Sequence, residues 1–114
     1  MAPYLFRFGY TAESWAALTE HPEDRRDMLA SRIFAMGGQL NGFWYSLGAH
    51  DGYAIVELPD NITAASIRAA ITATGSLTHL EATPLLTAED MVEALERARD
   101  FAYRPASQSP HPGA

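Results

Sequence analysis

The stretch FWYSLGAHDGYAIVELPDN, which runs from Phe43 to Asn61, decides the fold of this chain. Two runs rich in aromatic and aliphatic residues, 39–47 and 52–58, flank a polar segment that ends in Asp51 and Gly52. Asp-Gly is a preferred pair in tight turns, because both residues tolerate the positive φ that a short reversal between antiparallel strands requires. The stretch therefore predicts a β-hairpin. Its second strand ends at Pro59, which has no amide hydrogen to donate to a continuing ladder.

The residues before the hairpin predict one strand and a broken helical region. Tyr4 to Tyr10 places large aromatic residues at every second position, which is the period of a strand. Thr11 offers a side-chain oxygen as an N-cap, and apolar residues recur at helical spacing in a second stretch from Pro22 to Met36. Pro22 suits the first position of that stretch, so we expect two helical pieces that end at Gly37-Gly38.

The residues after the hairpin predict a helix, a strand and a further helix. Asp60 or Asn61 caps the first helix, and Gly75 ends it. Residues 77–86 are expected to form a strand. Thr87, with an acid three residues later, is an acidic variant of the capping box and begins the last helix, whose Met91, Val92, Leu95 and Ala98 form a face that could dock.

The resulting order, βαββαβ with an extra C-terminal helix, is typical of an α+β ferredoxin-like sandwich with a four-stranded antiparallel sheet. Its central strands would be 4–10 and 52–58, and its helices would cover one face and leave the other open. The length of 114 residues suits a single domain, which we place at residues 1–103. Residues 104–114 are rich in Pro and Ser and predict a disordered tail.

Composition excludes several classes of function. The formal net charge of −6 argues against nucleic-acid binding, which usually requires a basic surface. The chain has no Cys, so it has no disulfide, thiolate metal site or thiol nucleophile. No apolar run approaches the roughly 20 residues of a membrane-spanning helix, and no secretory signal is recognisable. We therefore expect a cytoplasmic protein.

From Tyr4 to about Ala98 the chain resembles the GYD domain family of small bacterial proteins. The resemblance is carried by six segments: residues 4–7, 10–11, 37–38, 43–45, 48–51 and 54–60, together with Thr83-Pro84-Leu85-Leu86-Thr87. In the Gly, Tyr, Asp signature Gly48 and Asp51 fit, whereas His50 stands where a Tyr is expected. The resemblance implies a fold akin to the dimeric α/β barrel proteins, in which two open sheet faces pack together. It implies no agreed reaction and no catalytic residue.

Alternation along the strands places apolar residues on the helix side of the sheet, namely Phe6, Phe8, Ala54, Val56, Leu80 and Ala82. It places Gly9 on the open face, where it also gathers charged residues. Arg7, Glu57, His79 and Glu81 share this face, so Arg7 could pair with Glu57, Glu81 or both. The cluster is either a structural ion pair at an interface or the polar floor of a ligand pocket. In the second case His79 and Glu81 are the candidate catalytic residues, since imidazole and carboxylate groups transfer protons near neutral pH.

Aromatic and turn residues complete the candidate ligand site. Three consecutive rings at 43–45 cannot all face the helices, so at least one points to the open face as a dimer anchor or a pocket wall. Asp51 is expected to hold the turn by bonding local backbone, and His50 could cover a pocket mouth. The predicted ligand-binding residues are Arg7, Tyr10, Phe43, Trp44, Tyr45, His50, Asp51 and Glu57.

The sequence predicts no cofactor. No two His residues have the i, i+4 spacing of a helical metal site, so a metal would need residues from distant strands, such as His50 and His79. Haem ligation by His79 is an analogy with other dimeric barrel proteins. No motif for nucleotide binding or for a nucleophilic serine is present.

Two classes of function fit these features. In the first, a homodimer binds a small organic molecule at the open face and catalyses, without a cofactor, proton abstraction, isomerisation or oxidation. In the second, the same face only oligomerises or senses a ligand, as in a stress-response module, with no catalysis. The sequence does not decide whether the protein is an enzyme.

Overall fold

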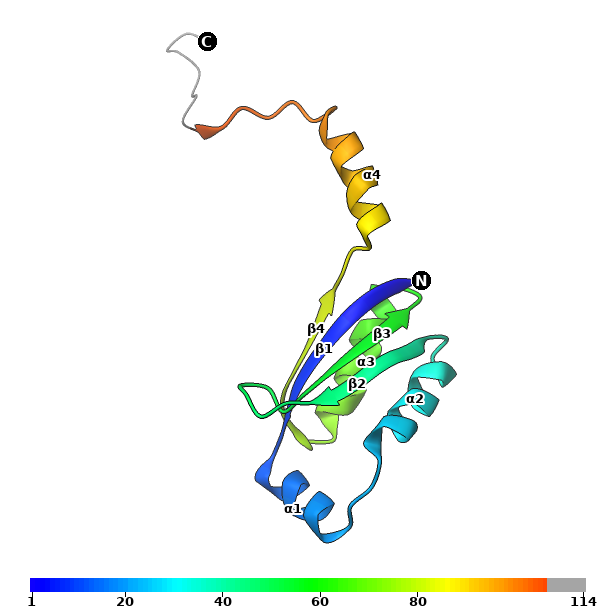
Figure 1. Cartoon of the computed structure of the whole chain (residues 1–114), viewed down its shortest axis with the longest axis vertical. Helices are drawn as coiled ribbons and strands as arrows, with labels where there is room; N and C mark the ends of the chain where they lie inside the picture. Colours follow the sequence, from blue (N-terminus) through cyan, green and yellow to red (C-terminus); the bar gives the residue numbers. More distant parts are fainter. Residues whose placement is uncertain (107–114) are drawn as a thin grey trace.

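The computed structural model describes residues 1–106 of the chain. In this part the elements follow the order β1 (Ala2–Tyr10), α1 (Ala12–Glu20), α2 (Arg25–Ala35), β2 (Gln39–Tyr45), β3 (Gly52–Leu58), α3 (Asn61–Ala73), β4 (Leu77–Pro84) and α4 (Ala88–Ala98) (Figure 1). The predicted order of strands and helices is confirmed. The predicted tail begins at Arg104, and residues 107–114 of it lie outside the described residues.

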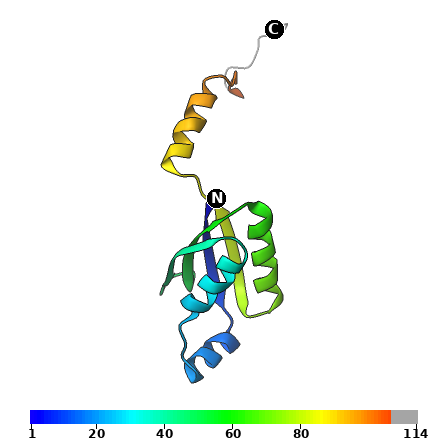
Figure 2. The same ribbon diagram turned by 90° about the vertical axis from the view of Figure 1, so that its right-hand side faces the viewer.

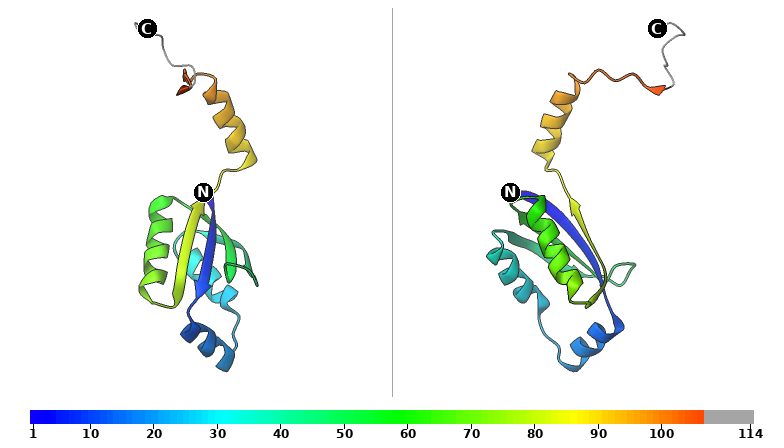
Figure 3. Two further views of the ribbon diagram at one scale, coloured as in Figure 1. Left: turned by 90° about the vertical axis from the view of Figure 1, so that its left-hand side faces the viewer. Right: turned by 180° about the vertical axis from the view of Figure 1, so that it is seen from behind.

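The four strands form one antiparallel sheet in the order β2-β3-β1-β4, as the ferredoxin-like prediction requires. β1 pairs with β3 from Ala2 opposite Leu58 to Phe8 opposite Gly52, and with β4 from Tyr4 opposite Pro84 onward. α2 and α3 lie on the same side of this sheet, which Figure 3 shows in its right-hand view. The other side, which faces the viewer in Figure 1, carries no helix of the described chain.

The core lies between the sheet and the two helices. The alternation of β1 and β3 buries every second residue, and Val56, Leu58 and Ile33 are almost completely shielded from solvent. Residues on the helix side of the sheet supply most of this core, which comprises Tyr4, Phe6, Phe8, Ile33, Ala54, Val56, Leu58, Ala64, Ile67 and Leu80. The assignment of Phe6, Phe8, Ala54, Val56 and Leu80 to the helix side is therefore confirmed.

Short polar side chains begin each helix. Thr11, Asp24, Asp60 and Thr87 occupy the N-cap positions, and each accepts a hydrogen bond from a backbone amide in the first turn. Thr87 and Asp90 form the predicted capping box. The expected start of the second helix at Pro22 is wrong. α2 begins at Arg25, because Asp24 accepts from the Arg26 amide and so starts the helix three residues later.

Glycine ends two of the helices in the predicted way. Gly37 follows α2 with a φ of 82°, and Gly75 follows α3 with a φ of 71°. A side chain at either position would strain the backbone, because L-residues rarely adopt this left-handed conformation. The helix ends predicted from these two glycines are thereby confirmed.

The hairpin between β2 and β3 is confirmed, but its turn differs from the prediction. No residue from Ser46 to Gly52 has a positive φ. The connection is a longer loop, residues 46–51, closed by a hydrogen bond from the Ser46 amide to the Asp51 carbonyl (2.8 Å). Gly52 is needed for space instead, because a Cβ there would collide with the Phe8 ring.

Two strands are shorter than the sequence predicted. β2 ends at Tyr45 rather than Leu47, since the loop begins at Ser46. β4 ends at Pro84 rather than Leu86. After Pro84 the Leu85 amide still donates to the Pro3 carbonyl (2.8 Å), so the chain leaves the sheet along the direction of β4.

α4 extends beyond the end of the sheet and packs against none of its strands (Figures 1 and 2). None of its residues is buried, and the side of the helix predicted to dock is exposed: Met91 by 46%, Val92 by 57% and Leu95 by 57%. The predicted apolar face of α4 is therefore present, but it packs on no other element of the described chain.

Candidate functional site

The open face of the sheet carries the predicted charged cluster at the junction of β1 and β4. Arg7 lies directly opposite Glu81 in the strand register, with Arg7 Nη2 at 3.6 Å from Glu81 Oε1. Arg7 Nη2 also donates a hydrogen bond to Thr83 Oγ1 (3.1 Å). The Glu81 side chain is half-exposed, so this ion pair contributes less than about 1 kcal/mol to stability.

The Arg7 guanidinium is not saturated by these contacts. It has five donor hydrogens, and its Nε is buried without a hydrogen-bond partner. A buried donor without an acceptor costs about 1–3 kcal/mol. The Nε donor of Arg7 is therefore unsatisfied within the described chain, whereas its Nη2 is bonded to Thr83.

Two histidines meet beside this pair. His50 Nδ1 and His79 Nε2 are joined by a hydrogen bond of 2.7 Å, although the residues are 29 positions apart. His50 Nε2 lies 3.8 Å from Glu81 Oε2, and Thr78 Oγ1 lies 3.1 Å from His79 Nδ1. An N–H···N bond needs one donor and one acceptor nitrogen. One of the two facing nitrogens therefore carries the hydrogen, and the other accepts it. The four side chains form a continuous polar chain from Thr78 to Glu81.

A missing side chain in β1 makes this meeting possible. Gly9 lies on the open face, and a Cβ there would approach His79 Cε1 to 2.6 Å and Thr78 Oγ1 to 2.7 Å. The His79 ring therefore lies over the β1 backbone. The strand register of β1 and β4 also shifts at Gly9 and Tyr10. The alternation of the sequence places Gly9 on this face. A residue without a side chain at that point is the sequence feature that indicates a close contact across β1.

Asp51 anchors the hairpin loop to β1 rather than to its own turn. Its Oδ2 accepts a hydrogen bond from the Tyr10 amide (2.8 Å), and its amide donates to the Phe8 carbonyl (2.8 Å). The expectation that Asp51 bonds local backbone is therefore wrong, because the loop crosses the end of β1 and Asp51 satisfies the amide freed by the register shift. This anchor holds His50 over His79.

The three consecutive aromatic residues of β2 divide between the two sides of the sheet. Trp44 lies opposite Tyr53 on the open face, and its ring covers Gly42, where a Cβ would collide with it. Phe43 lies on the helix side against Phe8, with ring centroids 5.6 Å apart. The prediction that at least one ring points to the open face is confirmed by Trp44, which is 54% exposed.

Tyr10 and Tyr45 form a separate aromatic group with Trp15 of α1. The two hydroxyl oxygens are 3.4 Å apart, and the Tyr10 ring meets the Trp15 ring edge-on at 5.0 Å. Burial raises the pKa of the Tyr10 hydroxyl well above its ordinary value, and the hydrogen bond with Tyr45 adds to this rise. The rings of these two predicted ligand-binding residues thus group with Phe8 and Phe43 rather than with the histidine pair.

Apolar and acidic side chains surround the polar cluster. Leu5, Tyr53 and Ile55 are half-buried on the open face, and the Tyr53 ring lies 5.7 Å from the His50 ring. Glu57 lies opposite Pro3 and Gln39 at the other end of the sheet, whereas Arg7 lies opposite Tyr53. Among the described residues Arg7 pairs with Glu81, so the expected pairing of Arg7 with Glu57 is not formed.

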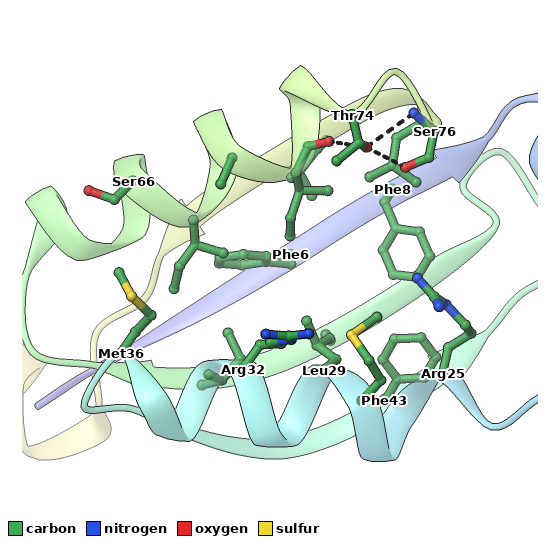
Figure 4. A pocket seen from close by; sticks show the side chains of 18 of the residues that line it. Phe6, Phe8, Arg25, Leu29, Arg32, Met36, Phe43, Ser66, Thr74 and Ser76 are labelled. Atoms are coloured by element: carbon green, nitrogen blue, oxygen red, sulfur yellow. Dashed lines mark hydrogen bonds between the residues drawn. The ribbon is translucent and has the colours of Figure 1, made fainter.

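Apart from the polar cluster on the open face, the structure has an apolar groove on the helix side of the sheet, between α2 and α3. It has a volume of about 490 Å³ and an apolar floor that includes Phe6, Phe8 and Leu80. Figure 4 shows Arg25 and Arg32 on the α2 side and Ser66 and Thr74 on the α3 side. No sequence pattern predicts this groove, because it depends on how far apart two helices pack.

The polar cluster supports two kinds of chemistry. The guanidinium of Arg7 can bind an oxygen anion, and the adjoining His and Glu groups can pass a proton. Three of the groups, His50, His79 and Glu81, also place one ligand atom each within 4.8 Å of the others, which is the donor set of a divalent metal site.

Among residues 1–106 no helix is long and apolar enough to cross a membrane.

Comparison with known proteins bears on the family and not on the chemistry. Comparisons with curated proteins and with solved structures gave no match. Comparison with protein families matches residues 4–95 to the GYD domain, and this range contains the sheet except the first two residues of β1, the first three helices and part of α4. With most of its length in that match, the chain belongs to the GYD domain family.

Proposed function

We propose that the protein is a homodimer in which the open sheet faces of two copies pack together and enclose a site for a small organic molecule. The observation that carries the proposal is the open face itself, where Trp44, Tyr53, Ile55 and Leu5 have no covering element in the described chain. Apolar surface of this kind marks an interaction site. A face that packs on its own copy gives an isologous interface, which is the commonest symmetric arrangement.

The polar cluster defines the chemistry of the enclosed site. Arg7 is suited to bind a carboxylate or carbonyl oxygen of the molecule, because a guanidinium donates in a fork geometry that matches such oxygens and the Arg7 Nε has no partner in the described chain. His79 and Glu81 are suited to transfer a proton, with His50 relaying it between them. The flat rings of Tyr53 and Trp44 favour a planar substrate. The proposed activity is proton transfer on a planar organic anion.

The competing function is a non-catalytic module that oligomerises or senses a ligand through the same face. In that case Arg7 and Glu81 act as an ion pair at the interface, and their partners come from the second copy. Both functions require the same dimer. They differ in whether a molecule is bound at the cluster and changed there.

The assembly is tested by sedimentation equilibrium of a Leu95→Glu protein and two matched variants of it. Leu95→Glu places a charge on the exposed apolar side of α4, so the open face is the contact under test. Ile55→Asp places a charge in the middle of the open face, whereas Ile62→Asp places one on α3, where the side chain is already 77% exposed. The proposal expects a dimer for Leu95→Glu alone and with Ile62→Asp, and a folded monomer with Ile55→Asp. A dimer that survives Ile55→Asp, or a monomeric Leu95→Glu protein, contradicts it.

The ligand is tested by native mass spectrometry of protein purified from its natural host. The proposal expects the wild-type dimer to carry an added small-molecule mass that is absent from Arg7→Leu, while His21→Ala keeps it. His21 is a suitable control because it lies between α1 and α2, away from the sheet. A dimer without added mass supports the non-catalytic module. An added mass that persists in Arg7→Leu contradicts the assigned role of Arg7.

A second candidate function is binding of a divalent transition metal by His50, His79 and Glu81. The observation that favours it is the convergence of two imidazoles and one carboxylate from separate parts of the chain. Two nitrogens bound to one metal at about 2.0–2.1 Å lie about 3.0 Å or more apart, so the 2.7 Å hydrogen bond between the rings would have to open slightly. The metal and the direct hydrogen bond therefore exclude each other.

Titration with Zn²⁺ and Co²⁺ distinguishes this candidate. Metal binding predicts one equivalent per chain, with a Co²⁺ visible spectrum that is lost in His79→Ala and in His50→Ala and kept in His21→Ala. Because the control removes one of the four His residues of the chain, it corrects for unspecific imidazole binding. A stoichiometry that falls equally in all three variants rejects the site.

A further inference from the structure

α4 is a formed helix without a surface to pack on. Its first turn is held by the capping box of Thr87 and Asp90, and Glu93 pairs with Arg97 one turn apart at 2.6 Å. A helix of 11 residues is nevertheless only marginally stable in water when it packs on nothing. The exposed apolar stripe of Met91, Val92 and Leu95 therefore indicates that α4 docks on another surface.

The groove between α2 and α3 has the complementary shape and character. α2 packs on β2 and α3 packs on β4, which leaves the apolar hollow of about 490 Å³ between them. Met28 and Met36, both among its lining residues, are partly exposed, and methionine adapts readily to an apolar partner. α2 has 11 residues and α3 has 13, so the groove matches the length of α4.

The charges of the helices are also complementary. α4 carries four carboxylates and one Arg. α2 carries three Arg and one Asp, and α3 carries one Arg and no acid. Arg25 and Arg32 line the groove on the α2 side, as Figure 4 shows. An acidic helix laid between α2 and α3 would therefore meet a basic rim on the α2 side of an apolar floor.

The path of the chain favours the groove of another copy over its own. Leu85 continues the ladder to Pro3, which directs the chain out along β4, and only Leu86 separates it from the N-cap Thr87. Tyr4, the register partner of Pro84, donates a hydrogen bond to Asn61 at the start of α3 (2.6 Å). The first turn of α3 therefore stands between the end of β4 and the groove of the same chain.

We propose that α4 of one chain docks in the groove between α2 and α3 of a second chain, with Met91, Val92 and Leu95 on the apolar floor. This contact lies on the opposite side of the sheet from the proposed dimer face, so it does not depend on the proposed function. It joins copies through a helix that each chain donates and a groove that each chain offers.

Crosslinking tests the proposal cleanly, because the chain has no Cys of its own. Leu95→Cys marks the apolar face of α4, and Ala70→Cys marks the groove. A short bismaleimide reagent is added to the double variant in the Ile55→Asp background, which removes the open-face dimer. The proposal expects crosslinked dimers on a denaturing gel, at least about ten times more than with Glu93→Cys and Ala70→Cys, which marks the polar face of α4.

Three results would overturn it. A crosslink within one chain, seen as a faster-migrating monomer band, would place α4 in its own groove. Equal crosslinking of the two cysteine pairs would show only random encounter. An absence of crosslinks, with an apolar small molecule retained in native mass spectra, would assign the groove to a ligand. Leu95→Glu provides the second check, since it should abolish association in the Ile55→Asp background and leave the sheet folded.

Discussion

The two faces of the sheet are built from alternate residues of the same strands, and they differ in almost every physical respect. On β3, Val56 and Leu58 are completely buried under α2 and α3, whereas the alternate residues Ile55 and Glu57 remain partly exposed. The helix side has a packed apolar core, and the open side combines apolar residues with Arg7, Glu81 and two histidines. One face therefore stabilises the chain, and the other is available for recognition.

The largest difference between the faces should appear when one aliphatic side chain is shortened on each. We expect Leu58→Ala to lower the free energy of unfolding by about 2–5 kcal/mol, because it opens a cavity in the core. Ile55→Ala, three residues earlier on the same strand, should cost clearly less at low protein concentration. Urea unfolding of both variants measures this. Equal losses would show that the open face is already packed within one chain.

The next effect concerns close packing at the end of β3. Gly52→Ala should destabilise the protein by about 1–3 kcal/mol, since the added Cβ collides with the Phe8 ring on the helix side. Gly48→Ala is the matched control in the same hairpin, where the nearest atom to an added Cβ is Ser46 Oγ at 3.5 Å. Thermal unfolding compares the two. A Gly48→Ala variant as unstable as Gly52→Ala would contradict this account of the loop.

A smaller effect is expected for the charged pair of the open face. Arg7→Leu should change the free energy of unfolding of the monomer by less than about 1 kcal/mol, because its partner Glu81 is half-exposed. Its effect should instead appear in dimerisation or ligand retention. Arg26→Leu on α2 is the control and should change neither. A large loss of monomer stability in Arg7→Leu would make the pair a structural element of the fold.

The smallest effect is a pH dependence at the start of α3. Hydrogen bonds from the Thr63 amide and hydroxyl hold the pKa of the exposed Asp60 carboxyl below its ordinary value of 3.8. A depressed folded-state pKa contributes stability that is present above 3.8 and is lost as the pH falls through the folded-state value. Acid unfolding of Asp60→Asn should therefore show a shallower loss below pH 3.8. An unchanged acid transition would rule out this contribution.

Local sequence signals predicted the parts of the molecule that depend on neighbouring residues. Alternation assigned Phe6 and Arg7 to opposite faces, and Thr87 with its acid three residues later predicted the start of α4. The helix start predicted from Pro22 was wrong, because Asp24 is the stronger cap and determines where α2 begins. The tight turn predicted from Asp51-Gly52 was also wrong. That pattern applies to two-residue connections, and this loop is longer.

The parts that escaped prediction depend on contacts between distant residues. The hydrogen bond of His50 to His79 requires the loop to cross β1, and that crossing requires the space at Gly9 and the anchor of Asp51 on Tyr10. Each residue was visible in the sequence, but none indicates the others by its spacing. The groove between α2 and α3 depends on helix separation, which is set by packing on different strands.

The fluorescence of Trp44 reports whether a second copy covers the open face. The chain has two Trp residues, so Trp15→Phe leaves Trp44 as the only reporter, and Trp44 is 54% exposed on the open face. Acrylamide quenching is measured over a range of protein concentrations, with Ile55→Asp as the control. If two open faces pack together, quenching falls as protein concentration rises, and it stays high throughout in Ile55→Asp. Equal, strong quenching of both proteins at every concentration would contradict it.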